Sequence, residues 1–164
     1  MVILGIDPGL AIVGFGVIEK GKFNTEVVDY GVITTPKEDT LPIRLEKIYK
    51  SMCALIDKYN PEQVALEELF FNTNTTTGIA VAEARGVILL ACIHKNLKLY
   101  EYTPLQIKQA LTGNGRADKQ QVQFMVKAIL KLKSIPRPDD AADGLAAALC
   151  HSQTNQILAG TDIR

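Results

Sequence analysis

Several residue types that would support other chemistries are scarce in this 164-residue chain. It has no Trp, only two His and three Cys. No apolar run approaches the ~20 residues of a membrane span, so we expect no membrane association. The cysteines are odd in number, widely spaced and form no CxxC pair, which argues against a disulfide framework and a cysteine zinc site. Reduced thiols in a cytoplasmic protein are the better interpretation.

The shortage of histidine also limits the catalytic possibilities. His94 lies beside Lys95 at the end of an expected helix, and His151 lies well past the acidic residues discussed below. Neither is placed as a general base, and no Ser-His-Asp or Cys-His motif is present. We therefore expect both histidines to be surface or packing residues.

The chain has no excess of either charge, with 18 basic and 18 acidic residues. The charges are nevertheless unevenly placed. Residues 1–94 carry 8 basic and 12 acidic residues, residues 95–137 carry 9 and 2, and residues 138–164 carry 1 and 4. A basic block beside acidic segments suits phosphodiester chemistry, because cations bind the backbone while carboxylates hold a metal. Solvated helix faces are the alternative explanation for scattered lysines.

Four carboxylates on hydrophobic segments are the most informative feature present. Asp7 and Glu67 each end a short apolar run, and Asp140 and Asp143 open a helical stretch rich in small residues. Carboxylates are rarely crowded or buried without a compensating partner. The set therefore predicts a bound cation, and oxygen ligands without His or Cys favour Mg²⁺ or Mn²⁺ over zinc.

Hydrophobic periodicity predicts a single α/β domain over residues 1–164. Strands are expected at 2–7, 12–18, 26–33, 63–67 and 97–102, with helices at about 40–59 and 79–95 and further helices beginning after 103, 118 and 138. Capping boxes are expected at the helix starts Thr103–Gln106 and Asp118–Gln121. Residues 68–78 are predicted to form an exposed loop. The order of elements gives a mixed sheet with helices on both faces.

This arrangement would bring the carboxylates together. If the first and fourth strands are parallel neighbours, Asp7 and Glu67 lie side by side at their carboxyl ends, where sites in open α/β sheets form. At about 100° per residue, Asp140 and Asp143 lie ~60° apart on one edge of the last helix. Gly144 and the neighbouring alanines allow that helix to approach the sheet, and Asp139 is interpreted as its N-cap.

At this point the chain resembles the RuvC-type Holliday junction resolvases of the retroviral-integrase/RNase H-like superfamily. The resemblance spans nearly the whole chain and rests on segments that occur in order: Gly5–Gly9, Gly14–Ile18, Ala65–Phe70, Glu83–Gly86, Gln106–Gln109, Gly115–Val122 and Asp140–Asp143. It implies an RNase H-like mixed five-stranded sheet. It also implies a structure-selective endonuclease that resolves four-way DNA junctions by paired cuts in homologous recombination and repair.

The same resemblance assigns the acidic residues to catalysis. Asp7, Glu67, Asp140 and Asp143 match the family's catalytic tetrad, which implies two Mg²⁺ ions per site, with Mn²⁺ able to substitute. Phosphodiester hydrolysis needs an activated water and a stabilised leaving oxygen, and two bridged ions supply both.

The resemblance further implies DNA contacts by basic and aromatic residues. Lys108 and Lys119 match basic positions near the scissile strand, and Arg116 is counted with them. Phe70 matches an aromatic placed against junction bases, although burial as a cap on the sheet edge is its alternative. In one departure from the family, the loop after Phe71 has no basic residue before Arg85; in another, the chain has no long basic tail.

As partners, the resemblance implies a second copy of the chain, the RuvA and RuvB branch-migration proteins and four-way junction DNA, in the cytoplasm of a bacterium. The apolar helix at 79–95 is the expected dimer contact, through some of its apolar residues: Val81, Val87, Ile88, Leu90 and Ile93. Val87 is taken as an exposed position of this helix.

Other function classes remain open on the sequence alone. Sugar kinases and chaperone ATPases share an Asp-Pro-Gly turn like that at Asp7, but they need two such domains. A non-catalytic junction-binding module would need only the basic block. An RNase H-like nuclease acting on RNA or on hybrids is the enzymatic alternative.

Overall fold

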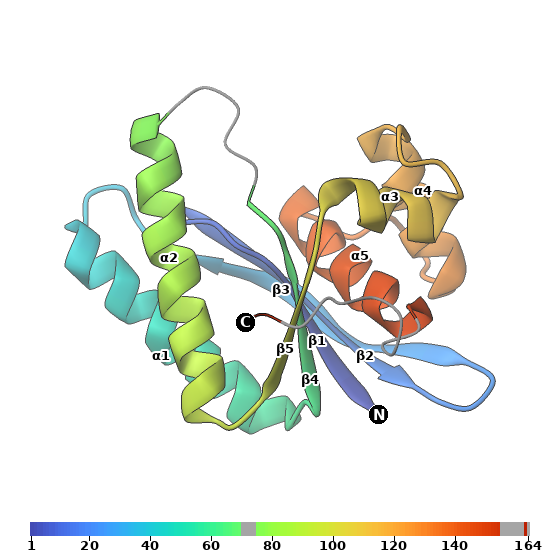
Figure 1. The fold of residues 1–164 in the computed structure, drawn as a ribbon, viewed down its shortest axis with the longest axis horizontal. Helices are drawn as coiled ribbons and strands as arrows, with labels where there is room; N and C mark the ends of the chain where they lie inside the picture. Colours follow the sequence, from blue (N-terminus) through green and yellow to red (C-terminus); the bar gives the residue numbers. More distant parts are fainter. Residues whose placement is uncertain (70–74, 155–162, 164) are drawn as a thin grey trace.

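A five-stranded mixed sheet carries five helices in the computed structural model, which describes residues 1–69, 75–154 and 163 (Figure 1). The strands are β1 (Val2–Asp7), β2 (Ile12–Lys20), β3 (Thr25–Thr34), β4 (Gln63–Glu67) and β5 (Lys98–Tyr102). The helices are α1 (Leu41–Tyr59), α2 (Thr75–His94), α3 (Pro104–Thr112), α4 (Lys119–Ile129) and α5 (Asp139–Gln153). In this described part, no helix is long and apolar enough to cross a membrane.

The sheet has the order β3-β2-β1-β4-β5, which confirms the predicted pairing of the first and fourth strands. β1, β2 and β3 form an antiparallel meander, while β4 runs parallel to β1 and β5 runs parallel to β4. Ile6 pairs with Leu66, and Glu67 pairs with Tyr102. The carboxyl ends of three parallel strands therefore meet at one edge of the sheet.

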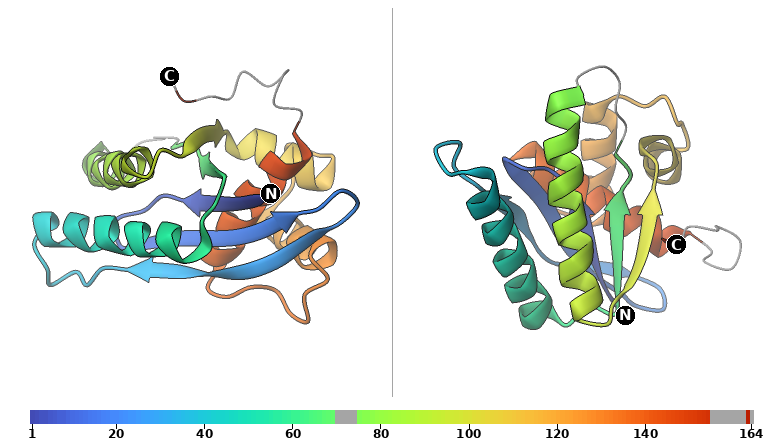
Figure 2. Two further views of the ribbon diagram at one scale, coloured as in Figure 1. Left: turned by 90° about the horizontal axis from the view of Figure 1, so that it is seen from below. Right: turned by 60° about the vertical axis from the view of Figure 1, so that its left-hand side comes forward.

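Helices cover both faces of the sheet, as predicted (Figure 2). Alternate residues of a strand point to opposite faces. Leu4, Ile6 and Leu66 belong to the core on the α1 and α2 side, whereas Ile3 and Ala65 belong to the core beneath α3, α4 and α5. By the same alternation, Asp7 and Glu67 extend from the sheet on the side of α3, α4 and α5.

Glycines bring the backbone of α5 into contact with the strands. A Cβ atom on Gly14 would lie 1.9 Å from the backbone oxygen of Asp140, and one on Gly5 would lie 2.1 Å from that of Gly144. A Cβ atom on Gly144 would in turn lie 2.7 Å from the backbone of Phe15. No other residue type fits at these crossings. This close approach places the start of α5 beside the end of β1.

Two sequence predictions about helix ends are wrong. α2 begins at Thr75, so Thr75–Gly78 are helical and not part of an exposed loop. Threonine disfavours helix by only a few tenths of a kcal/mol relative to most residues, which tertiary context readily overrides. Pro138 is the N-cap of α5, and Asp139 is its first helical residue, whose carboxylate pairs with Arg137. Both predicted capping boxes are confirmed, at Thr103 and at Asp118.

Candidate active site

The carboxylates line a hollow of about 300 Å³ at the carboxyl edge of the parallel strands. Asp7 comes from the end of β1, Glu67 from the end of β4 and Asp143 from the second turn of α5. The remaining lining comes from α3, α4 and α5: Pro104, Ile107, Lys108, Lys119, Val122 and Ala146. Three acidic side chains and two lysines therefore share one hollow with several apolar residues.

The acids lie close enough to perturb one another. Burial raises the pKa of Asp7 to about 8, with further increases from the charges of Glu67, Asp143 and Asp140. Burial and the charge of Asp143 raise the pKa of Glu67 to about 7. Burial also raises the pKa of Asp143, against the opposing effect of Lys119. Full ionisation of this cluster at neutral pH therefore requires additional positive charge.

Lys119 supplies part of that charge. Its ammonium group lies 2.9 Å from Oδ2 of Asp143 and 3.8 Å from Oδ2 of Asp139. It occupies this position because Asp118 caps α4, which makes Lys119 the first residue of the helix. Lys108 enters the hollow from α3, and its charge lowers the pKa of Glu67. The two predicted lysines thus lie beside the predicted acids.

The other predicted site residues are placed less directly. Asp140 is coupled to Asp7 by charge, but it is not among the described residues that line the hollow. Arg116 is exposed in the turn between α3 and α4, where its backbone N–H donates to Oδ1 of Asn114. Phe70 lies outside the described residues, so its predicted contact with DNA bases stays a prediction.

The donor set fits a hard divalent cation, because it consists of carboxylate oxygens whose mutual repulsion such an ion would relieve. Among the described residues, no three acidic, histidine or cysteine side chains already converge closely enough to hold a metal ion. Asp143 is instead paired with Lys119. The carboxylates are therefore gathered in one hollow, but they are not closed around a common point.

Sequence reasoning missed one feature near this site. His151, which the sequence predicts to be a surface or packing residue, is fully buried, and it also makes hydrogen bonds to Tyr102 and Gln63. These residues come from three different elements, so no local sequence pattern links them. His94 is exposed, as expected, and its ring contacts the hydroxyl of Tyr49.

Comparisons with known proteins show what the whole chain is similar to. A protein-family model described as crossover junction endodeoxyribonuclease RuvC matches residues 3–151. A relative with that description from Clostridioides difficile is 53% identical over 157 residues, which are 96% of this chain and 93% of the relative. Another, from Finegoldia magna, is 56% identical over 151 residues, 92% of each chain.

Solved structures show the same fold. The structure of Thermus thermophilus RuvC in complex with a Holliday junction substrate is 35% identical, with a TM-score of 0.93 and 99% coverage of both chains. The yeast mitochondrial Holliday junction resolvase Ydc2 is 14% identical, with a TM-score of 0.65 over 92% of this chain and 78% of that one. That second likeness concerns the fold alone.

Proposed function

We propose a metal-dependent mechanism for this chain, which belongs to the RuvC family of crossover junction endodeoxyribonucleases and resolves Holliday junctions. One observation carries the proposal. The carboxylates of Asp7, Glu67 and Asp143 share a hollow with two lysines, and burial raises the pKa values of all three acids, with further increases from the charges of neighbouring acids. Such a cluster is stable as a charged group only with a cation.

In this mechanism Asp7, Glu67, Asp140 and Asp143 would hold two Mg²⁺ ions, for which Mn²⁺ could substitute. Bound ions of this kind lower the pKa of a water nucleophile and stabilise the leaving oxygen of a phosphodiester. The chain's own lysines contribute charge: Lys108 and Lys119 stabilise the negative charge that develops on the scissile phosphate. The apolar residues that line the hollow would strengthen these interactions by lowering the local dielectric.

The test is cleavage of a synthetic four-way junction, beside a linear duplex of the same sequence, with and without Mg²⁺. Asp7→Asn and Glu67→Gln should abolish cleavage and retain junction binding, because each removes a carboxylate ligand and no phosphate contact. Asp57→Asn is the matched control, since it makes the same change at an exposed acid of α1 that pairs with Lys95. Cleavage at wild-type rates by Asp7→Asn, or in excess EDTA, would refute the mechanism.

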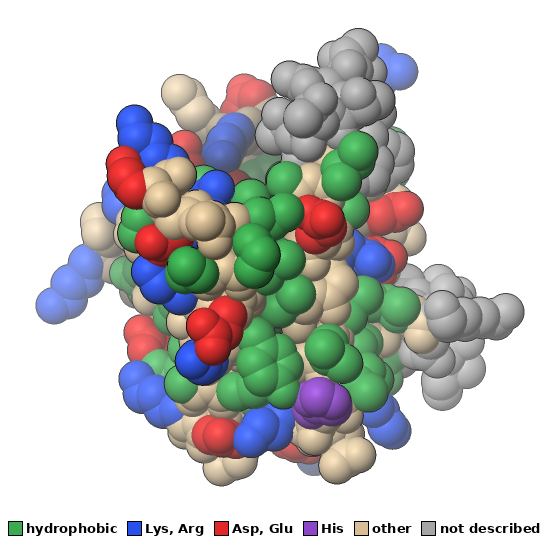
Figure 3. Space-filling model, turned by 90° about the vertical axis from the view of Figure 1, so that its left-hand side faces the viewer, with side chains coloured by type: hydrophobic (Ala, Val, Ile, Leu, Met, Phe, Trp, Pro, Cys, Tyr) green, Lys and Arg blue, Asp and Glu red, His purple; other side chains and the backbone are tan. Residues whose placement is uncertain are grey.

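We further propose that the chain acts as a homodimer, because opposing strands of a junction must be cut at matching positions and a two-fold dimer supplies two related centres. On α2, Ile79, Leu90 and Ile93 are 62%, 48% and 57% exposed. Hydrophobic side chains are visible across the face that α1 and α2 form (Figure 3). A second copy of this apolar face is the occupant that the paired reaction requires.

The expected contact residues need one correction. Ile88 is fully buried in the chain's own core. Val87 is partly buried and packs against the same core, so Val87 is not an exposed position. A charged substitution there would disturb the fold as well as the interface. Leu90 is the better position for a test. Association with RuvA and RuvB in the bacterial cytoplasm completes the proposal, and it rests on family membership.

A further inference from the structure

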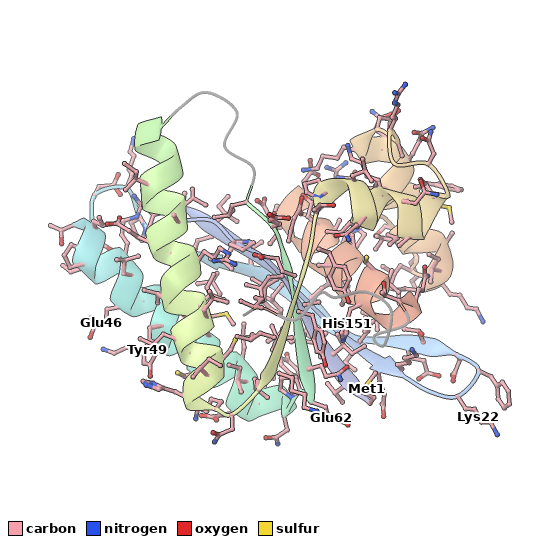
Figure 4. The ribbon with its side chains drawn as sticks, viewed as in Figure 1. Met1, Lys22, Glu46, Tyr49, Glu62 and His151 are labelled. Carbon is pink, nitrogen blue, oxygen red and sulfur yellow. The ribbon has the colours of Figure 1, made fainter. Side chains whose placement is uncertain are left out.

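A chain of hydrogen bonds connects α5 to β4 and β5 on the active-site side of the sheet. The hydroxyl of Tyr102 lies 2.6 Å from Nδ1 of His151, and Nε2 of His151 lies 2.8 Å from Oε1 of Gln63. Nε2 of Gln63 donates to the hydroxyl of Tyr100 over 3.5 Å. Figure 4 shows His151 where α5 crosses the strands. Each partner thus comes from an element that borders the active site.

The network is electrically neutral, and all its members are buried except Gln63, which is partly buried. His151 and Tyr102 are 0% and 1% exposed, and the centres of the His151 and Tyr100 rings lie 4.4 Å apart. Burial, together with the charge of Lys20, lowers the pKa of His151 to about 4, so the ring is neutral near pH 7. Because the Gln63 oxygen only accepts, Nε2 of His151 donates to it, and Nδ1 accepts from Tyr102. Buried networks with satisfied partners rigidify the elements that they join.

These residues join the same elements that supply the carboxylates. Gln63 lies four residues before Glu67 on β4, and Tyr102 pairs directly with Glu67 in the sheet. His151 lies eight residues after Asp143 on α5, a distance of about 12 Å along the helix axis. The carboxylates repel one another and cannot fix their own spacing. A hydrogen-bond network between the same elements, away from the hollow, can fix the spacing of the carboxylates.

We propose that His151 is a positioning residue for junction cleavage, which fixes the orientation of α5 relative to β4 through Tyr102 and Gln63 and so sets the spacing between Asp143 and Glu67. This inference rests on the proposed catalytic role of the carboxylates. Because Asp143 lies about 12 Å from His151 along α5, a small rotation of the helix displaces its carboxylate substantially. A tilt of ~5° about His151 would move Asp143 by about 1 Å, and a misplacement of that size can cost ~10²-fold in rate.

The experiment measures single-turnover cleavage and junction affinity separately for Tyr102→Phe, which removes one hydroxyl and keeps the ring. At a temperature where the variant is folded, we expect cleavage to be slower by about 10-fold or more while affinity stays within about twofold. Gln63→Leu should behave similarly. The double variant should be no slower than the slower single variant, because the residues act as one unit.

The matched control is Met52→Ala in α1, because the Met52 side chain is fully buried in the core on the other face of the sheet. It should lower the melting temperature and keep the wild-type cleavage rate of the folded protein. If Tyr102→Phe and Gln63→Leu likewise keep that rate, the network only stabilises the fold and the inference is wrong. Asp143→Asn separates the two proposals: if it cleaves normally, the assignment of the acids fails. If it is inactive while Tyr102→Phe is unaffected, only the positioning role fails.

Discussion

The metal-free protein should lose stability as the pH rises, and Asp7→Asn should remove part of that loss. In the folded chain, burial and neighbouring charges raise the pKa of Asp7 from its ordinary value of 3.8 to about 8. The folded state therefore holds this proton more tightly than the unfolded state does. A raised carboxyl pKa contributes stability that is complete below about pH 4 and is lost as the pH rises toward 8.

The size of the effect follows from the same values. The rise from 3.8 to about 8 would correspond to roughly 5–6 kcal/mol for an isolated carboxyl, at about 1.4 kcal/mol for each pKa step. Glu67 and Asp143 share the repulsion, so relieving one member removes only part of it. We expect Asp7→Asn to recover about 2 kcal/mol at pH 8, or about 4–8 °C in Tm for a domain of this size.

The measurement is thermal unfolding in EDTA between pH 4 and pH 8.5, with Asp57→Asn as the control for a lost surface charge. Wild type and Asp7→Asn should unfold at similar temperatures near pH 4 and diverge as the pH rises. Saturating Mg²⁺ at pH 8 should stabilise wild type more than Asp7→Asn, because a ligand that binds only the folded state adds to its stability. Parallel pH curves for the two proteins would show that Asp7 is not held in a repulsive, buried environment.

Three further predictions test other parts of the molecule. Removing the charge of Lys108 or Lys119 should lower the single-turnover cleavage rate by about 10²-fold with little change in junction affinity. As the control, Lys127→Ala on α4 should leave the cleavage rate nearly unchanged. Equal effects at all three lysines would indicate that they act only through the overall electrostatic field. Leu90→Glu should reduce the mass in sedimentation from about twice 17.9 kDa to 17.9 kDa and abolish paired cuts, and a wild-type monomer that still cuts symmetrically would rule out the dimer mechanism. Gly14→Ala should lower the free energy of unfolding by about 1–3 kcal/mol in denaturant titrations, because its Cβ would lie 1.9 Å from a backbone oxygen of α5. Wild-type stability of this variant would contradict the described contact.

Local signals in the sequence were sufficient for most of the fold. Runs with a period of two or of 3.6 located the elements, and the capping boxes at Thr103 and Asp118 marked the starts of α3 and α4 correctly. The parallel pairing of β1 with β4 then followed from the order of elements, and it brought Asp7 beside Glu67. These features depend on residues that are close in the chain or on simple rules of sheet topology.

The features that sequence reasoning could not supply depend on packing between distant segments. The pairing of Lys119 with Asp143 requires the start of α4 to lie against α5, and that position follows from the shared core beneath the sheet. The start of α2 at Thr75 goes against local propensity. The His151 network joins three elements through side chains that, taken singly, resemble ordinary packing residues. Tertiary contacts decide each of these cases.

A net charge of zero is compatible with junction binding because the two signs act at different places. The acids at the hollow are largely buried, and the raised pKa values of Asp7 and Glu67 reduce their average negative charge near neutral pH. Lys108 and Lys119 line the same hollow, and Lys119 remains about half exposed. Because Lys119 is more exposed than Asp143, an approaching phosphate backbone meets the ammonium group of Lys119 before the carboxylate of Asp143. In the proposed mechanism, bound metal ions would neutralise the remaining carboxylate charge at the point where the DNA must come closest. The acids of the hollow would therefore limit DNA binding in the absence of metal and favour DNA binding once the ions are held.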